Sequence, residues 1–220
     1  MIVSLNMSKA QGVSFGIKAG VNLQNITGLN MSSNVGGVQQ NGTSTMNIGF
    51  HVGGIMKLGF SENWALIPEF LYTTSGVKQT ITQTYAIGGV NYNSSSVNTT
   101  SLGYIQIPVL LNYRIPGGLN FSAGPYLSML VGSNSSTSTT INGETTTHTS
   151  SSDTSNSKVD IGLALGVGFQ TGIGLGIGLR YDIGMTSVYK TYTYNNSGMY
   201  YTQPASGKNG VLQLSLNFMF

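Results

Sequence analysis

The sequence alternates between apolar residues and small or polar residues over long stretches. In GIGLGIGLRYDIGM, residues 172–185, every second residue is apolar, and glycines, Arg180 and Asp182 stand between them. Successive side chains of a β-strand point to opposite faces, so this pattern predicts a strand with one apolar face. Eight segments follow it: 13–23, 46–60, 64–76, 102–115, 119–131, 159–170, 172–185 and 211–220.

The connections between these segments alternate strictly between short and long. The short ones lie at 61–63, 116–118 and 171–174, and the long ones at 24–45, 77–101, 132–158 and 186–209. This order predicts an antiparallel up-and-down sheet with tight turns at one end and loops at the other. The low-complexity polar loop within 132–158 is expected to be mobile.

Charge decides which face meets which environment. Charged residues make up only 7% of the chain, against about 25% in soluble domains. None lies on the apolar face of a predicted strand, and a base at a bilayer midplane costs about 2–4 kcal/mol in barrel proteins. The sequence therefore predicts an eight-stranded transmembrane β-barrel with the apolar face toward lipid and these charges in the lumen: Lys18, Lys57, Glu69, Arg114, Asp160, Arg180 and Asp182.

Buried charges need partners, so an ion-pair network is expected around Glu69, Arg114, Arg180 and Asp182. Which acid meets which base depends on the shear of the barrel and stays open. His51 is expected to form hydrogen bonds in the same lumen, which Lys18 and Asp160 also line. Aromatic residues near strand ends are expected at the membrane interfaces: Trp64, Tyr72, Tyr113, Phe169, Tyr181 and Phe220.

The sequence contains no pattern typical of nucleic-acid, nucleotide or metal binding. The nine basic residues are scattered singly, with a net charge of +3, which argues against nucleic-acid binding. The glycines of GVGFQTG and GIGLGIG repeat with period two and no helix follows, unlike a nucleotide loop. The two histidines, His51 and His148, form no metal cluster. We expect no catalytic residue, metal or cofactor.

Several blocks of sequence resemble the PorT-like outer-membrane β-barrel family. They include ENWALIPEFLYTTSG, YIQIPVLLNYR, AGPYL and GLRYDIGM, and the resemblance covers about 13–220. It implies an eight-stranded barrel of the Gram-negative outer membrane with periplasmic turns and termini, four extracellular loops and an accessory role in protein secretion. Phe220 is similar to the terminal aromatic residue by which such proteins are recognised for insertion. Gln106 stands where the family often has an acid, and Asn112 where it often has a base.

The expected organisation is simple. Residues 1–12 are a signal-peptide remnant or a frayed N-terminus, and 13–220 form one barrel domain. The expected function is non-enzymatic, with the lipid bilayer and a larger outer-membrane assembly or a surface as partners. A small-solute channel or carrier is the alternative, and a soluble ligand-binding barrel is a third class. Tyr192, Tyr194 and Tyr200 are expected in a hairpin that extends the last two strands.

Overall fold

The computed structural model describes residues 12–27, 33–35, 38–87, 90–141, 143–150, 158–187, 192–196, 199–203 and 208–220. These residues form twelve strands: β1 (Val13–Thr27), β2 (Ser33–Val35), β3 (Val38–Gly59), β4 (Trp64–Ile87), β5 (Val90–Arg114), β6 (Leu119–Ile141), β7 (Glu144–Ser150), β8 (Val159–Gln170), β9 (Leu175–Ser187), β10 (Tyr192–Asn196), β11 (Met199–Gln203) and β12 (Lys208–Met219). Across the described ranges, no helix is long and apolar enough to span a membrane.

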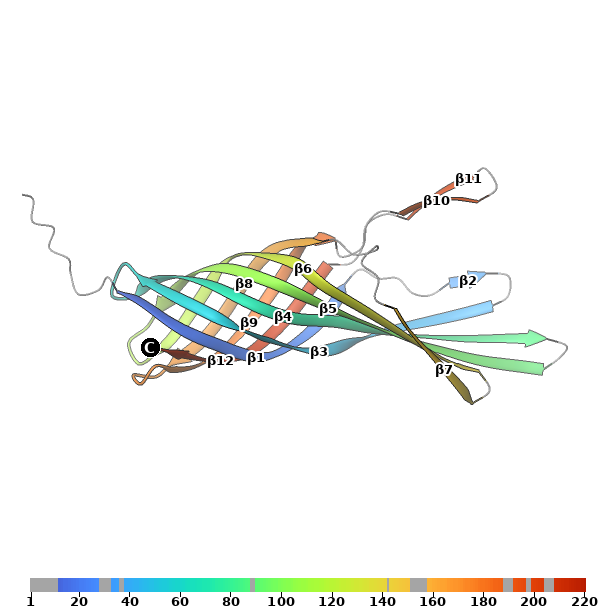
Figure 1. Cartoon of the computed structure of the whole chain (residues 1–220), viewed down its shortest axis with the longest axis horizontal. Helices are drawn as coiled ribbons and strands as arrows, with labels where there is room; N and C mark the ends of the chain where they lie inside the picture. The colour runs from blue at the N-terminus through green and yellow to red at the C-terminus, as the bar shows by residue number, and fades with distance from the viewer. Residues whose placement is uncertain are drawn as a thin grey trace, which may run out of the picture.

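Eight of the described strands close into an antiparallel ring, in the order β1, β12, β9, β8, β6, β5, β4 and β3 (Figure 1). β1 pairs with β12 on one side and with β3 on the other, so that Lys18 lies opposite both Asn217 and Gly53. Closure pairs the backbone groups that an open sheet would leave unpaired in lipid. The predicted eight-stranded up-and-down barrel is confirmed.

The two faces of the barrel have the predicted orientation. Leu163, Leu165 and Ile177 are 43%, 51% and 51% exposed on the outer face, whereas Arg180 is only 3% exposed. Most of the large apolar side chains of the eight ring strands point outward in the same way. The molecule therefore has an apolar exterior and a largely polar interior, which is the reverse of a soluble barrel.

The three tight turns lie together at one end of the barrel, which we call the turn end (Figure 1). In the turn between β5 and β6, Gly117 and Gly118 have φ angles of 103° and 104°, values that side-chain-bearing residues rarely adopt. The last residue lies at this end too, because the Phe220 amide donates to the Phe15 carbonyl at 2.8 Å.

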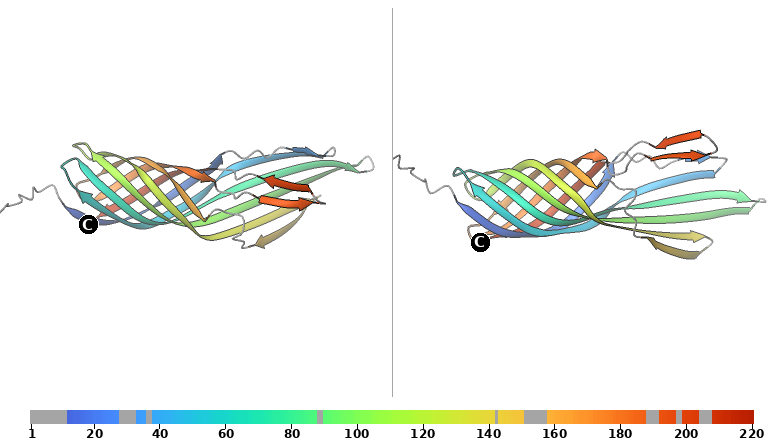
Figure 2. Two further views of the ribbon diagram at one scale, coloured as in Figure 1. Left: turned by 90° about the horizontal axis from the view of Figure 1, so that it is seen from above. Right: turned by 45° about the horizontal axis from the view of Figure 1, so that its top comes forward.

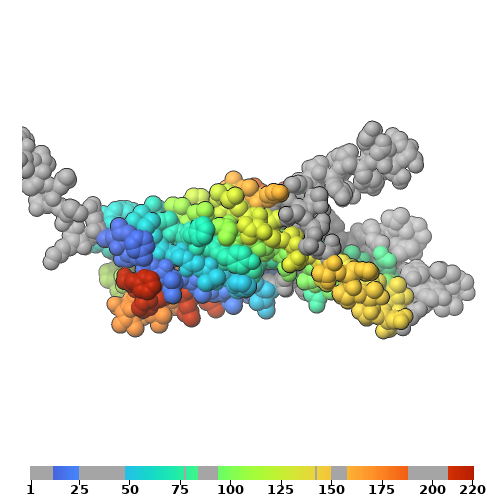
Figure 3. Space-filling view, in the orientation of Figure 1, coloured from blue at the N-terminus to red at the C-terminus, as the bar shows by residue number. Residues whose placement is uncertain are grey.

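The long connections differ from the prediction. β3, β4, β5 and β6 continue beyond the ring as paired ribbons, and β7 adds to β6 (Figure 2). Residues 132–141 and 144–150 belong to this hairpin, which projects beyond the barrel in yellow in Figure 3, whereas 142 and 151–157 fall outside the described residues. The mobility expected for 132–158 stays a prediction. Hydroxyl groups bridge the two strands: the Ser138 hydroxyl is 2.9 Å from that of Thr147, and the Thr140 hydroxyl is 2.9 Å from that of Thr145. β-Branched threonine favours strands, and such cross-strand pairs stabilise them.

The predicted hairpin around Tyr192 and Tyr194 exists, but it does not extend the last two ring strands. β10 and β11 pair with each other from Tyr192–Gln203 to Asn196–Met199 and form a separate two-stranded sheet. The predicted N-terminal segment 1–12 lies outside the described residues except for Gly12.

The outward orientation can be tested by placing a charge on the apolar surface. We expect Leu165→Arg, in the middle of β8, to lower the free energy of unfolding by about 2–4 kcal/mol in lipid vesicles, because the guanidinium must enter hydrocarbon. Thr147→Arg, on the exposed hairpin strand β7, should change it by less than about 0.5 kcal/mol. Guanidinium titration followed by fluorescence of Trp64, the one tryptophan, measures both. Equal effects would contradict the orientation.

Candidate functional site

Small residues on β8 and β9 make room for long side chains inside the barrel. At Gly162 and Gly166 of β8, the position that a side chain would occupy faces the lumen and side chains of β6. A Cβ atom at Gly162 would lie 2.6 Å from the ring of Tyr126, and one at Gly166 would lie 2.7 Å from the Ser122 hydroxyl. The glycines of this face therefore set where the larger lumen groups can lie.

Four charged side chains meet at mid-height in the lumen, and we call them the central ion cluster. Lys18 of β1 lies 2.9 Å from Glu69 of β4, and Arg180 of β9 lies 2.6 Å from the other oxygen of Glu69. The Arg180 Nε is 3.0 Å from Asp182 Oδ1. All four side chains are buried, and their two positive and two negative charges balance.

Gln106 completes this cluster from β5. Its Nε2 donates to Asp182 at 2.9 Å, and its Oε1 accepts from Arg180 at 3.2 Å. The amide therefore serves an acid and a base at once and adds no charge of its own. A neutral side chain thus links the two charged groups of the cluster.

Asp160 lies in a second polar group, closer to the ribbons. Three neutral donors bind its carboxylate: Tyr126 at 3.2 Å, Asn209 at 2.9 Å and Thr186 at 2.5 Å. Within the described residues it forms no ion pair. Asp160 thus shares the lumen with the central ion cluster and relies on hydrogen bonds instead of a base.

His51 also lies in the lumen, where it is 1% exposed. Its Nδ1 is 2.7 Å from Asn22 Oδ1, and Asn22 donates in turn to the Thr73 hydroxyl at 2.7 Å. In the part of the chain that the structure describes, no group of three histidine or acidic residues could hold a metal ion.

Arg114 does not join the network that was predicted for it with Glu69, Arg180 and Asp182. Val109 of β5 pairs with Pro68, the neighbour of Glu69, and Arg114 lies five residues further along β5. At about 3.3 Å per residue, this displacement is roughly 16 Å. Arg114 therefore lies near the turn end, where it donates to the Gln170 carbonyl at 3.4 Å.

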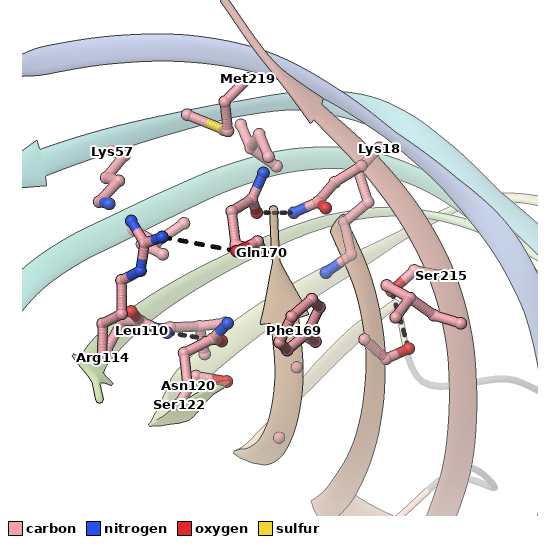
Figure 4. A pocket seen from close by; sticks show the side chains of 18 of the residues that line it. Lys18, Lys57, Leu110, Arg114, Asn120, Ser122, Phe169, Gln170, Ser215 and Met219 are labelled. Atoms are coloured by element: carbon pink, nitrogen blue, oxygen red, sulfur yellow. Dashed lines mark hydrogen bonds between the residues drawn. The ribbon is translucent and has the colours of Figure 1, made fainter. Parts of the chain in front are cut away.

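Between the central ion cluster and the turn end lies a cavity of about 500 Å³ that opens at the turn end, and we call it the vestibule. Figure 4 shows Lys57 and Arg114 on one side of this cavity and the Lys18 side chain on the other. On the other side of the cluster, a gap of about 20 Å³ is lined by Gln106, Tyr126 and Asp160, and such a volume holds about one water molecule. The lumen is thus open on the turn side and filled at mid-height.

Sequence reasoning missed a set of apolar residues that point inward. Leu71 is fully buried, and Leu110 and Tyr126 pack with Ala164. The signal was a break in alternation, because Leu71 stands between Phe70 and Tyr72, and Leu110 follows Val109 directly. Consecutive apolar residues in a strand must occupy both faces.

The predicted interface aromatics all lie on the outer surface. Trp64, Tyr113, Phe169 and Phe220 are near the turn end, and the rings of Trp64 and Tyr113 have centroids 4.7 Å apart. Tyr72 and Tyr181 lie toward the ribbons and are 39% and 45% exposed. Their position at the headgroup level remains a prediction.

Comparison with known proteins gives one family match. The family model described as "Outer membrane protein beta-barrel domain" matches residues 8–190. No curated protein matches the chain.

Similar solved structures include those of three bacterial proteins. Ail, the attachment invasion locus protein of Yersinia pestis, is 9% identical over 94% of this chain and 97% of its own, with a TM-score of 0.38. Neisserial surface protein A is 13% identical over 95% of this chain and 99% of its own, with a TM-score of 0.42. The outer membrane protein OprG of Pseudomonas aeruginosa is 12% identical over 96% and 97%, with a TM-score of 0.43.

The central ion cluster can be tested by removing its shared acid. We expect Glu69→Gln to lower the free energy of unfolding by about 3–5 kcal/mol, because two buried cations lose their common carboxylate. The double variant Lys18→Met/Glu69→Leu removes one cation as well and retains the Arg180–Asp182 pair. It should be destabilised less than Glu69→Gln alone in the same guanidinium titration. If Glu69→Gln left the stability unchanged, the cluster would not be the desolvated network described above.

Proposed function

Because this chain belongs to the family of outer membrane protein beta-barrel domains, we propose that it is a non-enzymatic barrel of the Gram-negative outer membrane that works through its projecting hairpins. In this proposal the barrel is a membrane anchor and the ribbons bind a surface or a larger outer-membrane assembly. The bilayer is its constant partner, and it uses no nucleic acid or cofactor.

The filled mid-lumen is the observation that carries this proposal. The central ion cluster draws side chains from β1, β4 and β9, and Gln106 adds one from β5. These groups bridge the bore from several sides, and each binds another group of the protein. A lumen closed in this way favours an anchoring role over the passage of solutes.

The lengths of the strands support a role outside the membrane. A transmembrane strand needs about 9–11 residues, and β8 and β9 have 12 and 13. β4 and β5 have 24 and 25 residues, so about half of each extends beyond a bilayer. These ribbons carry many serine, threonine and asparagine side chains, which suit contacts with a polar partner.

The orientation in the membrane and the accessory role that we propose follow from the resemblance to PorT-like barrels. We place the tight turns and both termini in the periplasm and the ribbons outside the cell, with the exposed aromatics at the interfaces. The accessory role is then participation in a protein secretion complex or another outer-membrane assembly.

A small-solute channel or carrier is the second candidate, and the vestibule favours it. The cavity of about 500 Å³ reaches Lys18, Glu69 and Arg180 from the turn end, so the central ion cluster is the main barrier along that route. Rearrangement of these side chains would be required for conduction.

Conductance separates the two candidates. In planar bilayers the natural chain should give no steps above background, because the cluster blocks the lumen. The variant Glu69→Ala/Arg180→Ala should show more current than the natural chain if it folds, since two of the bridging side chains are gone. Migration on electrophoresis with and without heating reports folding. Steps from the natural chain itself would favour the channel.

A trimmed hairpin tests the binding role. Ser136 and Thr149 are paired across β6 and β7, so residues 137–148 can be replaced by Asn-Gly, a preferred two-residue hairpin turn. We expect the trimmed chain to insert normally but to lose proteins that co-purify with the full chain after crosslinking in outer membranes. An unchanged set of co-purifying proteins would contradict a role for this hairpin.

A further inference from the structure

Basic side chains outnumber acidic ones among the residues that line the vestibule, although Glu62 lines a neighbouring cavity together with Lys57 and Arg114. Lys18, Lys57, Arg114 and Arg180 line the vestibule, with Glu69 as the one acidic side chain among the lining residues. Glu69 already binds Lys18 and Arg180. Within the described residues, Lys57 and Arg114 form no ion pair.

These two cations lie together at the mouth of the vestibule. Figure 4 shows the side chains of Lys57 and Arg114 reaching toward the same space, from β3 and β5. The hydrogen bond from Arg114 to the Gln170 carbonyl holds its guanidinium in this direction. Two like charges at one half-buried place repel each other, and an anion between them would relieve this repulsion.

The remaining lining adds polar groups and an apolar wall. Asn112 and Asn120 bind each other at 3.1 Å beside Arg114. Ile55, Ile67 and Leu110 form an apolar patch of the same cavity. A volume of about 500 Å³ falls within the range of about 300–1,000 Å³ that is usual for small-molecule sites, which combine apolar walls with a few placed polar groups.

We propose that the vestibule binds a small organic anion with a short apolar body. Its carboxylate or similar group lies between Lys57 and Arg114, and its apolar part lies against Ile55, Ile67 and Leu110. The central ion cluster forms the floor of this site, so the ligand enters and leaves at the turn end. The site is independent of the ribbons and of whatever they bind.

Hexanoate is a suitable probe, and hexanamide is its neutral counterpart of similar shape. The full chain in zwitterionic lipid nanodiscs is titrated with each by calorimetry, with empty nanodiscs as the blank. Saturable binding of hexanoate is expected, with hexanamide at least about tenfold weaker, because a charge-assisted contact is lost.

Paired charge variants locate the site. Lys57→Gln/Arg114→Gln should weaken hexanoate binding by about tenfold or more. Lys158→Gln/Lys208→Gln removes the same charge from two exposed residues at the other end of the barrel and should bind hexanoate as the natural chain does. Heat-dependent migration on electrophoresis confirms that both variants are folded.

Three results would overturn the proposal. They are no saturable binding of hexanoate, equal binding of hexanamide, or equal loss of binding in the two folded double variants. To place the apolar part of the ligand, Leu110→Asn should weaken hexanoate binding while the weaker binding of acetate stays the same. Unchanged hexanoate binding in Leu110→Asn would remove the apolar wall from the site.

Discussion

The structure depends on one constraint, which is that every polar group inside the hydrocarbon layer must find its partner within the protein. The backbone meets this constraint through ring closure, since β1 pairs with both β3 and β12. The side chains meet it by pointing inward, where Arg180 binds Glu69 and Asp182. Both solutions follow from alternation, which sends one face of every ring strand toward lipid and the other toward the lumen.

The interior is layered along the barrel axis as a result. Asp160 and its neutral donors lie nearest the ribbons, the central ion cluster lies at mid-height, and the vestibule lies at the turn end. Charges cancel in the middle layer, where Gln106 links an acid to a base. Toward the turn end, Lys57 and Arg114 form no ion pair within the described residues and lie at a cavity that is open at that end.

The sequence predicts strand identity and orientation well, because alternation is a local property of the chain. The stretch around Leu163 and Leu165, in which every second residue is apolar, shows it directly. It does not predict register, since the partner of a residue depends on the stagger of strands around the ring. Arg114 therefore lies outside the central ion cluster, roughly 16 Å along β5 from Val109, which pairs with the neighbour of Glu69. Leu71 and Leu110 were missed because the inward face was treated as uniformly polar. The hairpin of β6 and β7 was missed because low-complexity composition outweighed the strand preference of threonine.

The long strands are neighbours in the ring, which has a mechanical consequence. β3, β4, β5 and β6 are consecutive, whereas β8, β9, β12 and β1 make up the shorter half. A load applied to the tips of the ribbons acts on a lever attached to one half of the circumference. It is transmitted to the other half through two seams, Val13–Leu58 to Gln24–Asn47 and Leu119–Phe169 to Met129–Val159. The hydrogen-bonded ladders at these two seams must therefore carry such a load if the barrel is to stay closed.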